Sequence, residues 1–355
     1  DWHLSTYAKP TADRIPCLPY LLDRLSLVYL PRATELDRNE LLDQTLSDAY
    51  PARGATSSSG VLKPELQAGQ LHAWLAPGTP IDAFKPVPQA YRNRSKYQTR
   101  ENDCLQVSVV LNDDRMCEEH ETVSDIYEER AADLPIDVTI QSGLDRSALA
   151  DIFEANNDFV HYIGHCDDGG LRCPDGNLDI ADIAASNTRT FFLNACGSYE
   201  QGLSLVEQGS IAGGVTFKKV LDKQAAKVGT AFARLLVHGF SIERALQLAR
   251  RRIMMGKDYA VVGDGTYALL PSPKQPAVVR IEADEPGYQI RCEMLTAQSN
   301  GDRYDLPFDG REILNGDSLE ISVSAAELEG VLDSTSLPVI YDGDFHWSEE
   351  LVGTL

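Results

Sequence analysis

The sequence predicts an α/β fold with a mostly parallel sheet and helices on both of its faces. Between about residues 104 and 272, apolar segments of strand length alternate with helical segments, a pattern typical of parallel sheets that are covered by helices. Hydrophobic residues make up 43% of the 355 residues, which is enough for a sizeable core. No run of about 18 or more apolar residues occurs, so we expect no membrane-spanning helix.

The predicted strands are short apolar runs rich in β-branched and aromatic residues, bounded by turn residues. Five such runs occur in the central zone, at 104–111, 135–140, 158–164, 189–195 and 211–217. The fourth is especially aromatic and leads into Cys196-Gly197-Ser198. Between the third and the fourth, residues 166–177 are expected to form a loop that contains a Pro174-Asp175-Gly176 turn.

Helical periodicity predicts helices between and after these strands, at 116–131, 146–155, 199–208, 222–238 and 241–255. Gly209 and Gly239 are expected to end the helices before them, because glycine readily adopts the left-handed conformation of a helix C-cap. The last helix has one apolar face and carries three arginines, 250–252, near its C-terminal end, where cations suit the helix dipole. We interpret that run as a helix end, with contact to a partner or an acidic linker as the alternative.

Composition divides the chain into three zones. Residues 1–100 are rich in proline and turn residues, contain an apolar stretch at 25–30, and form a mixed region of unknown role that ends in a polar linker at 92–102. The α/β pattern occupies 101–273. Residues 277–355 carry alternating β-like stretches separated by Asn-Gly and Asp-Gly pairs at 300–301, 309–310, 315–316 and 342–343. They predict a small β-rich domain.

Charge is the unusual property of this composition. Thirty-two basic residues against 54 acidic residues give a net charge of −22, which argues against nucleic acid or an anionic membrane as the partner, because phosphate contacts need clustered Lys and Arg. Asp outnumbers Glu, 32 to 22, and Arg outnumbers Lys, 22 to 10. This bias resembles that of proteins from salt-in halophilic archaea, and we interpret it as adaptation to salt.

Two neighbouring strands end in residues that can carry chemistry. The third closes on HYIGHC, which contains His165 and Cys166, and the fourth closes on LNACGS, which contains Cys196. The carboxyl ends of parallel strands meet at one crevice, so we expect His165 beside Cys196. An imidazole can take the proton of a thiol, and the N-terminus of the following helix favours the thiolate. The backbone amides of Cys166 and Cys196 would face the same crevice and hold an oxyanion.

The segment 104–272, about half of the chain, resembles the CHAT proteases, which are caspase-like relatives of caspases and separase. The family's two strand ends read His-x-x-Gly-His-Gly and Leu-Asn-Ala-Cys-x-Ser, and this chain matches them at His161, Gly164, His165, Leu193, Asn194, Ala195, Cys196 and Ser198. Later matches are Ala225, Ala226, Glu243, Ala245, Leu246, Ala249, Arg250, Gly263 and Asp264. The resemblance implies that His165 is the general acid and base and Cys196 the nucleophile of a peptide-bond hydrolase.

The chain departs from the family pattern at three places. Cys166 stands where the family has the glycine whose amide helps to form the oxyanion hole, and Phe217 stands at the usual Trp position. An acidic pair found in many members is reduced to Asp222. We expect Asp167, Asp168 and Asp222 to shape the primary specificity pocket, which would favour a basic residue on the amino side of the scissile bond. A solvated acidic face is the alternative.

Structural roles stay open for the same residues. Cys196 could be a buried core thiol and His165 a hydrogen-bonded histidine at a strand end, whereas His161 is interpreted as structural. A zinc site is an alternative that the spacing disfavours, since it fits no standard finger; its donors would be His161, His165, Cys166 and Cys173. Residues 263–265, Gly-Asp-Gly, lack the Lys of a phosphate-binding loop and are interpreted as a turn into the last strand.

The predicted function is therefore a cysteine endopeptidase that needs no metal or nucleotide cofactor. Seven cysteines, an odd number, and the lack of a basic and apolar leader indicate reduced thiols in the cytoplasm. The expected partners are a protein or peptide substrate and a regulatory protein, and the resemblance implies a role in defence or regulated cell death. The alternative, motivated by Cys166, is a pseudoprotease that binds a peptide or partner domain without cleaving it.

Overall fold

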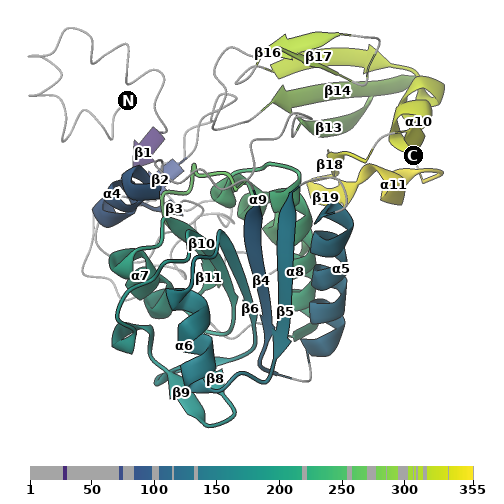
Figure 1. Cartoon of the computed structure of the whole chain (residues 1–355). Helices are drawn as coiled ribbons and strands as arrows, with labels where there is room; N and C mark the ends of the chain where they lie inside the picture. The colour runs from purple at the N-terminus through teal and green to yellow at the C-terminus, as the bar shows by residue number, and fades with distance from the viewer. Residues whose placement is uncertain are drawn as a thin grey trace, which may run out of the picture.

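The computed structural model of the chain describes most of the sequence from Phe84 onward. The described residues are 27–29, 72–74, 84–97, 104–113, 116–131, 135–217, 222–253, 258–269, 277–284, 286–294, 303–306, 308, 311–314, 318–334 and 336–354. Within them, a large sheet between two layers of helices carries a second, smaller sheet at one end (Figure 1).

The large sheet is nine-stranded and mainly parallel, as the sequence predicts. Its strands lie in the order β1 (Leu27–Tyr29), β2 (His72–Trp74), β3 (Phe84–Lys85), β12 (Tyr259–Gly263), β11 (Ala212–Thr216), β10 (Thr190–Asn194), β6 (Phe159–Ile163), β4 (Leu105–Leu111) and β5 (Ile136–Ser142). The pair β11 and β12 is antiparallel, and every other pair is parallel. The first two sequence zones, residues 1–100 and 101–273, thus both contribute strands to this sheet.

Helices cover both faces of this sheet (Figure 1). One layer holds α5 (Cys117–Ala131), α8 (Asp222–Val237) and α9 (Ile242–Ala249), and the other holds α4 (Pro88–Tyr97), α6 (Arg146–Glu154) and α7 (Tyr199–Gln208). The apolar face predicted for α9 is buried. Gly209 and Gly239 follow α7 and α8 with φ of 148° and 87°, so both predicted stops are confirmed.

The polar run predicted as a linker at 92–102 begins instead as a helix. Helix α4 includes residues 92–97 and starts at Pro88, whose fixed φ suits the first helical position. Its buried residues recur at helical spacing, and the Asn93 side chain donates to the carbonyls of Val206 and Ser210, both at 2.8 Å. A polar residue that anchors a helix is invisible to a hydrophobic pattern.

Two further predictions are corrected. The loop expected at 166–177 is a small antiparallel sheet of β7 (Cys166–Asp167), β8 (Gly170–Cys173) and β9 (Gly176–Leu178), whose strands are too short to show alternation. The helix predicted at 241–255 ends at Ala249 and continues as a 3₁₀ turn, η3 (Arg250–Arg252). The Gly-Asp-Gly turn follows strand β12 and does not lead into it, and its buried Asp264 pairs with Arg94 at 2.6 Å.

The C-terminal zone is β-rich, as predicted. Its five-stranded sheet has the order β17 (Ser318–Val323), β14 (Gly287–Met294), β13 (Ala277–Asp284), β18 (Pro338–Tyr341) and β19 (Asp344–Trp347). A two-stranded sheet of β15 (Arg303–Asp305) and β16 (Glu312–Leu314) and the unpredicted helices α10 (Ala325–Ser334) and α11 (Ser348–Leu351) complete it. Asp342 and Gly343 form the predicted hairpin turn with positive φ. The other three turn pairs lie outside the described residues.

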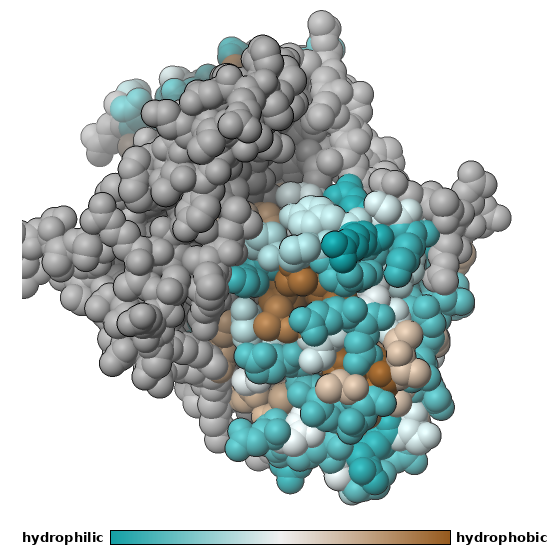
Figure 2. Space-filling model, turned by 90° about the vertical axis from the view of Figure 1, so that its left-hand side faces the viewer, coloured by the Kyte–Doolittle hydropathy of each residue, from teal (hydrophilic) through white to brown (hydrophobic). Residues whose placement is uncertain are grey.

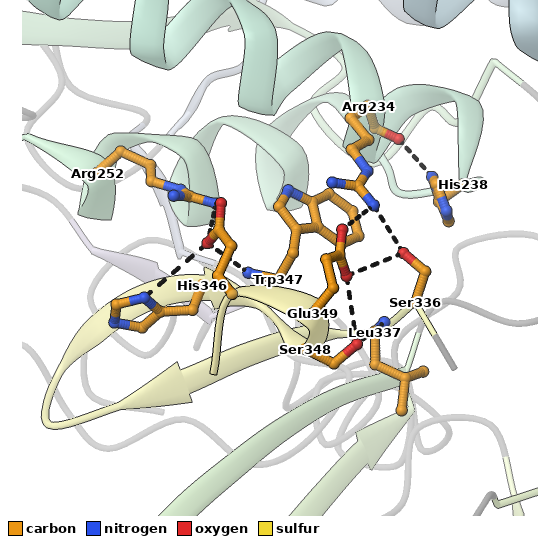
Figure 3. A network of polar contacts seen from close by, with 10 residues as sticks. Arg234, His238, Arg252, Ser336, Leu337, His346, Trp347, Ser348 and Glu349 are labelled. Carbon is orange, nitrogen blue, oxygen red and sulfur yellow. Dashed lines mark hydrogen bonds and ion pairs between the residues drawn. The ribbon is translucent and has the colours of Figure 1, made fainter. Parts of the chain in front are cut away.

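This sheet is attached to the helix layer through arginines and aromatic rings (Figure 3). The Arg234 guanidinium lies 3.8 Å from the centroid of the Trp347 ring and pairs with Glu349, and Arg252 pairs with Glu350 at 2.8 Å. Phe345 and Trp347 belong to the same buried cluster as the residues of α8 and α9. The arginine run thus forms the end of a helix, as interpreted, and its contacts are to another part of the same chain, where Arg251 donates to the Gly343 carbonyl.

The surface over α4, α6 and α7 is mostly hydrophilic in its described part, with hydrophobic residues gathered in two small areas (Figure 2). No described helix is both long and apolar enough to cross a bilayer.

Candidate active site

Three neighbouring strands bring three polar side chains to one edge of the large sheet. Leu111 of β4 is the register partner of Ile163 of β6, and Ile163 is the register partner of Asn194 of β10. Asp113, His165 and Cys196 each lie two residues beyond these partners. The edge predicted to bring His165 and Cys196 together therefore also carries a carboxylate.

Asp113 contacts His165 directly, through its Oδ2 and the Nε2 of the ring. Both side chains are largely buried, with 11% and 19% of their surface exposed, so water screens the contact only in part. The sequence analysis missed Asp113. The signal was present, because Asp113 follows a buried strand at the same edge as the other two residues.

The turn that carries His165 is fixed by the residue three positions before it. The Tyr162 hydroxyl donates to the carbonyls of His165 and Arg172, at 3.2 and 2.8 Å. Its ring folds against Gly164, where an added Cβ would lie 2.8 Å from the hydroxyl oxygen. The glycine of the HYIGHC string is therefore required for a close approach, and it allows Tyr162 to hold the His165 backbone.

The turn that carries Cys196 is fixed from strand β11. The Thr216 hydroxyl donates to the Ala195 carbonyl at 2.5 Å and accepts from the Gly197 amide at 2.9 Å, so it holds the backbone on both sides of Cys196. The Ser198 hydroxyl adds a bond to the Leu193 carbonyl at 2.9 Å. Gly197 has a φ of 74°, a conformation that favours glycine. The sequence analysis also missed Thr216, because a threonine at a strand end belongs to no sequence motif that would indicate its role.

His165 and Cys196 line the same small pocket. Its walls are formed by Met116, Gly164, His165, Asn194, Ala195, Cys196, Thr216 and Ala225. Cys196 is partly exposed, so a reagent or substrate can reach its thiol. Among the residues described, no group of three or more His, Cys, Asp or Glu side chains could hold a metal ion. The site thus offers a thiol, an imidazole and a carboxylate.

The two amides predicted to hold an oxyanion lie in different backbone settings, one in the small sheet and one in a turn. Cys166 faces Leu171 across the small sheet, and the adjacent bond from the Arg172 amide to the His165 carbonyl makes this a non-hydrogen-bonded pair. The Cys166 amide is therefore not used by that ladder. The Cys196 amide lies in the turn between β10 and α7.

The Cys166 side chain is a second thiol close to Cys196. Burial, and then the charge of Asp167 and a contribution from Cys196, raise the pKa of the Cys166 thiol to about 12. Cys166 therefore stays a neutral thiol at physiological pH and is unsuited to nucleophilic attack.

The three predicted substrate-binding carboxylates belong to different elements of the fold. Asp167 Oδ1 accepts from the Gly169 amide at 3.1 Å and from Asn177 Nδ2 at 2.5 Å, so it braces the small sheet. Asp168 is exposed at the turn that follows. Asp222 is the first residue of α8. Asp167 and Asp168 both raise the pKa of the Cys166 thiol electrostatically.

His161 is a buried residue in the middle of strand β6, four positions before His165. Its ring is fully buried and packs edge-on against Phe192, with centroids 5.1 Å apart. Loss of solvent, followed by the nearby His120, lowers the pKa of His161 to about 3, and the Glu119 carboxylate at 3.8 Å does not offset this. His161 is thus neutral, in agreement with the structural role expected for it.

No protein-family model and no curated protein matches the sequence. Among solved structures, the chain is similar to the Arg-specific cysteine proteinase gingipain R, RgpB, with 10% identity, a TM-score of 0.45, and 82% of this chain and 89% of that chain covered. It is also similar to the complex of Porphyromonas gingivalis RgpB pro- and mature domains, with 10% identity, a TM-score of 0.43 and 72% and 68% covered. For the Saccharomyces cerevisiae separase-securin complex the values are 14%, 0.38, 49% and 13%. These likenesses concern the fold.

Proposed function

We propose that this chain is a cysteine peptidase in which His165 and Cys196 hydrolyse peptide bonds. The observation that supports it best is their common position: both residues line one pocket, at strand ends that are in register. Asp113, which contacts the His165 ring, supplies the third group of a charge-stabilised triad.

The contact with Asp113 assigns the two ring nitrogens of His165. Because Nε2–H donates to the carboxylate, the lone pair of the neutral ring is on Nδ1, which accepts the Cys196 proton. The imidazolium formed in this step is stabilised by Asp113. The resulting thiolate is the nucleophile.

The chemistry then follows in two halves. The Cys196 sulfur bonds to the peptide carbonyl carbon, and the carbonyl oxygen becomes an oxyanion held by the amides of Cys166 and Cys196. His165 returns its proton to the leaving amine as the C–N bond breaks. Water, deprotonated by His165, attacks the thioester carbonyl, and the thiolate leaves with the proton from His165 to restore the enzyme.

The carboxylates near the pocket mouth favour a basic residue on the amino side of the cleaved bond. Asp167, Asp168 and Asp179 all act on the Cys166 thiol, so the potential at this side of the site is negative. We place Asp167 and Asp168 at the primary specificity pocket on this ground, and we propose Asp222, the first residue of α8, as the third carboxylate there. A cytoplasmic setting, a regulatory protein partner and a role in defence or cell death are parts of the same proposal.

A peptidase of this kind is tested with a peptide library on wild type and two variants. Wild type is expected to cleave, C196A to lose all cleavage, and the matched cysteine variant C173A, whose substitution lies in strand β8 of the small sheet, to keep it. Persistent cleavage by C196A would contradict the role of Cys196 as the nucleophile.

A second candidate function rests on the thiol of Cys166. Its nearness to Cys196 favours a pseudoprotease that binds a peptide in this pocket without cleaving it. If wild type does not cleave and C166G does, the second function replaces the first.

A further inference from the structure

A buried polar junction lies directly behind Cys196 and joins four elements of the fold. At its centre is the Asn194 side chain, which is two residues before Cys196, is 2% exposed, and lines the pocket. Its Nδ2 donates to Glu119 Oε1 of α5 at 2.5 Å and to the Ala225 carbonyl of α8 at 3.1 Å. Its Oδ1 accepts from the Tyr259 hydroxyl of β12 at 3.1 Å. Both amide protons and the amide oxygen are thus engaged.

This junction is closely packed as well as hydrogen-bonded. Gly229 of α8 faces it, and a Cβ added there would lie 1.9 Å from Glu119 Oε1 and 3.0 Å from Asn194 Nδ2. Helix α8 can therefore approach the carboxylate only because residue 229 has no side chain. Glu119 is itself 1% exposed, so its carboxylate has little freedom to move.

The junction is connected to both catalytic turns through the backbone. The Asn194 carbonyl accepts from the Gly164 amide at 3.3 Å, one residue before His165, and the Asn194 Cα leads through Ala195 to Cys196. A rotation of the Asn194 side chain would therefore move the two strand ends relative to each other. Catalysis requires the thiol and the imidazole to keep a fixed separation, and a displacement of about 1 Å can cost a hundredfold in rate.

We propose that Glu119 is a positioning residue of the peptidase: its carboxylate, through Asn194, holds the turn of Cys196 in register with that of His165. This inference rests on the proposed function and adds a group that touches neither substrate nor either catalytic side chain. In this hydrogen bond Asn194 is the donor and Glu119 the acceptor. The proposal can therefore be tested by exchanging the donor and acceptor groups between the two positions.

The experiment exchanges donor and acceptor between the two positions. N194D places a carboxylate against the Glu119 carboxylate and should lower kcat about 100-fold while KM stays within about threefold. E119Q/N194D gives residue 119 an N–H that donates to the new carboxylate, and should recover at least about tenfold of the lost kcat. Because a smaller folded fraction would also lower the apparent kcat at constant KM, kcat is expressed per folded enzyme, and a residue that only supported folding would then leave it unchanged in N194D.

Three further variants test the same contact without adding a charge. E119Q alone keeps an acceptor oxygen and should stay within about threefold of wild type, whereas E119A should lose about tenfold or more. G229A should resemble E119A, because its methyl group displaces the carboxylate. The matched control is E121A, at an exposed glutamate two positions along the same helix.

Alkylation of Cys196 separates this proposal from the proposed function. The rate of iodoacetamide labelling of Cys196, followed by peptide mass spectrometry, should fall about tenfold in N194D and E119A and recover in E119Q/N194D, whether or not peptides are cleaved. If wild type labels fast but cleaves nothing, the function is wrong and the positioning role stands. If E119A labels and turns over like wild type, or if E119Q/N194D is no better than N194D in both measurements, the positioning role is overturned.

Discussion

Asp113 and His165 lie in contact at the ends of β4 and β6, each two residues beyond residues that are partners in the sheet. The register of two strands therefore fixes which carboxylate meets the imidazole. Cys196 occupies the corresponding position on β10. The proposed catalytic group is built by strand register, with each side chain placed by a different strand.

Replacing Asp113 by Asn should lower kcat at neutral pH by about 100-fold or more. The Asn amide donates to the ring and favours the wrong tautomer, and it no longer stabilises the imidazolium. KM for a peptide should change little. The matched control is D137N, at an exposed position of β5. A D113N enzyme with wild-type kcat would show that His165 works without its carboxylate.

The Thr216 hydroxyl should be required for activity beyond its effect on stability. T216V keeps the shape of the side chain but removes both bonds that hold the turn of Cys196, so kcat should fall about tenfold. The free energy of unfolding should fall by about 1–3 kcal/mol, because the buried Ala195 carbonyl loses its hydrogen bond. T216S, which keeps the hydroxyl, should restore both. Equal kcat in T216V and T216S would contradict this role.

Stability should decrease when the pH falls below about 6.5, because of His161. The folded protein keeps this ring neutral with a pKa of about 3, while the unfolded chain takes up the proton near the ordinary histidine pKa of 6.5. The stabilisation is complete above 6.5 and is lost as the pH falls from there towards 3. Between pH 7 and 5 the loss is about 2 kcal/mol. Urea unfolding of wild type and H161Q across this range measures it, and parallel pH curves would refute the assignment.

The cysteines should separate into reactive and unreactive groups. Burial raises the pKa of Cys166 to about 12, of Cys173 to about 11 and of Cys292 to about 12. At pH 7 these three should label slowly with iodoacetamide, and their rates should rise about tenfold per pH unit. Cys196 should label fast at pH 7. Mass spectrometry of each peptide over time provides the measurement, and slow labelling of Cys196 would support the pseudoprotease.

The attachment of the C-terminal sheet should contribute measurably to stability. W347A removes a ring that is 2% exposed and should cost about 3–5 kcal/mol. R234A removes a partly exposed cation over that ring and should cost about 1–2 kcal/mol, whereas R234K should recover only part of it, because Lys lacks the planar fork. Chemical unfolding measures both. Unchanged unfolding of W347A would show that the sheet is only loosely attached.

Much of the fold could be predicted from the sequence, because its central strands are apolar runs and its helices end at glycines such as Gly209 and Gly239. The polar helix α4 could not, since its anchor is Asn93, which reads as a surface residue. Strands β7 to β9 are too short for a periodic pattern. Elements with one apolar face were therefore found, and elements held by polar contacts were missed.

The sequence predicts those residues of the candidate site that directly follow a buried strand and belong to a recognisable motif. His165 and Cys196 follow buried strands and carry recognisable side chains, so their common position was foreseen. Asp113 follows the same rule but sits in a polar stretch without a motif. Thr216 and Glu119 act through contacts between elements distant in sequence, and only the packed structure brings these together.

Helix α8 makes a mechanical connection across the molecule. Near its first turn Ala225 forms part of the pocket wall, and near its last turn Arg234 holds Trp347 of the C-terminal sheet. Its 16 residues form a stiff rod about 24 Å long. A tilt of the helix at its Arg234 end would therefore displace Ala225 and the pocket wall beside Cys196. In the opposite direction, a displacement of the pocket wall would tilt the helix and move its contact with the C-terminal sheet.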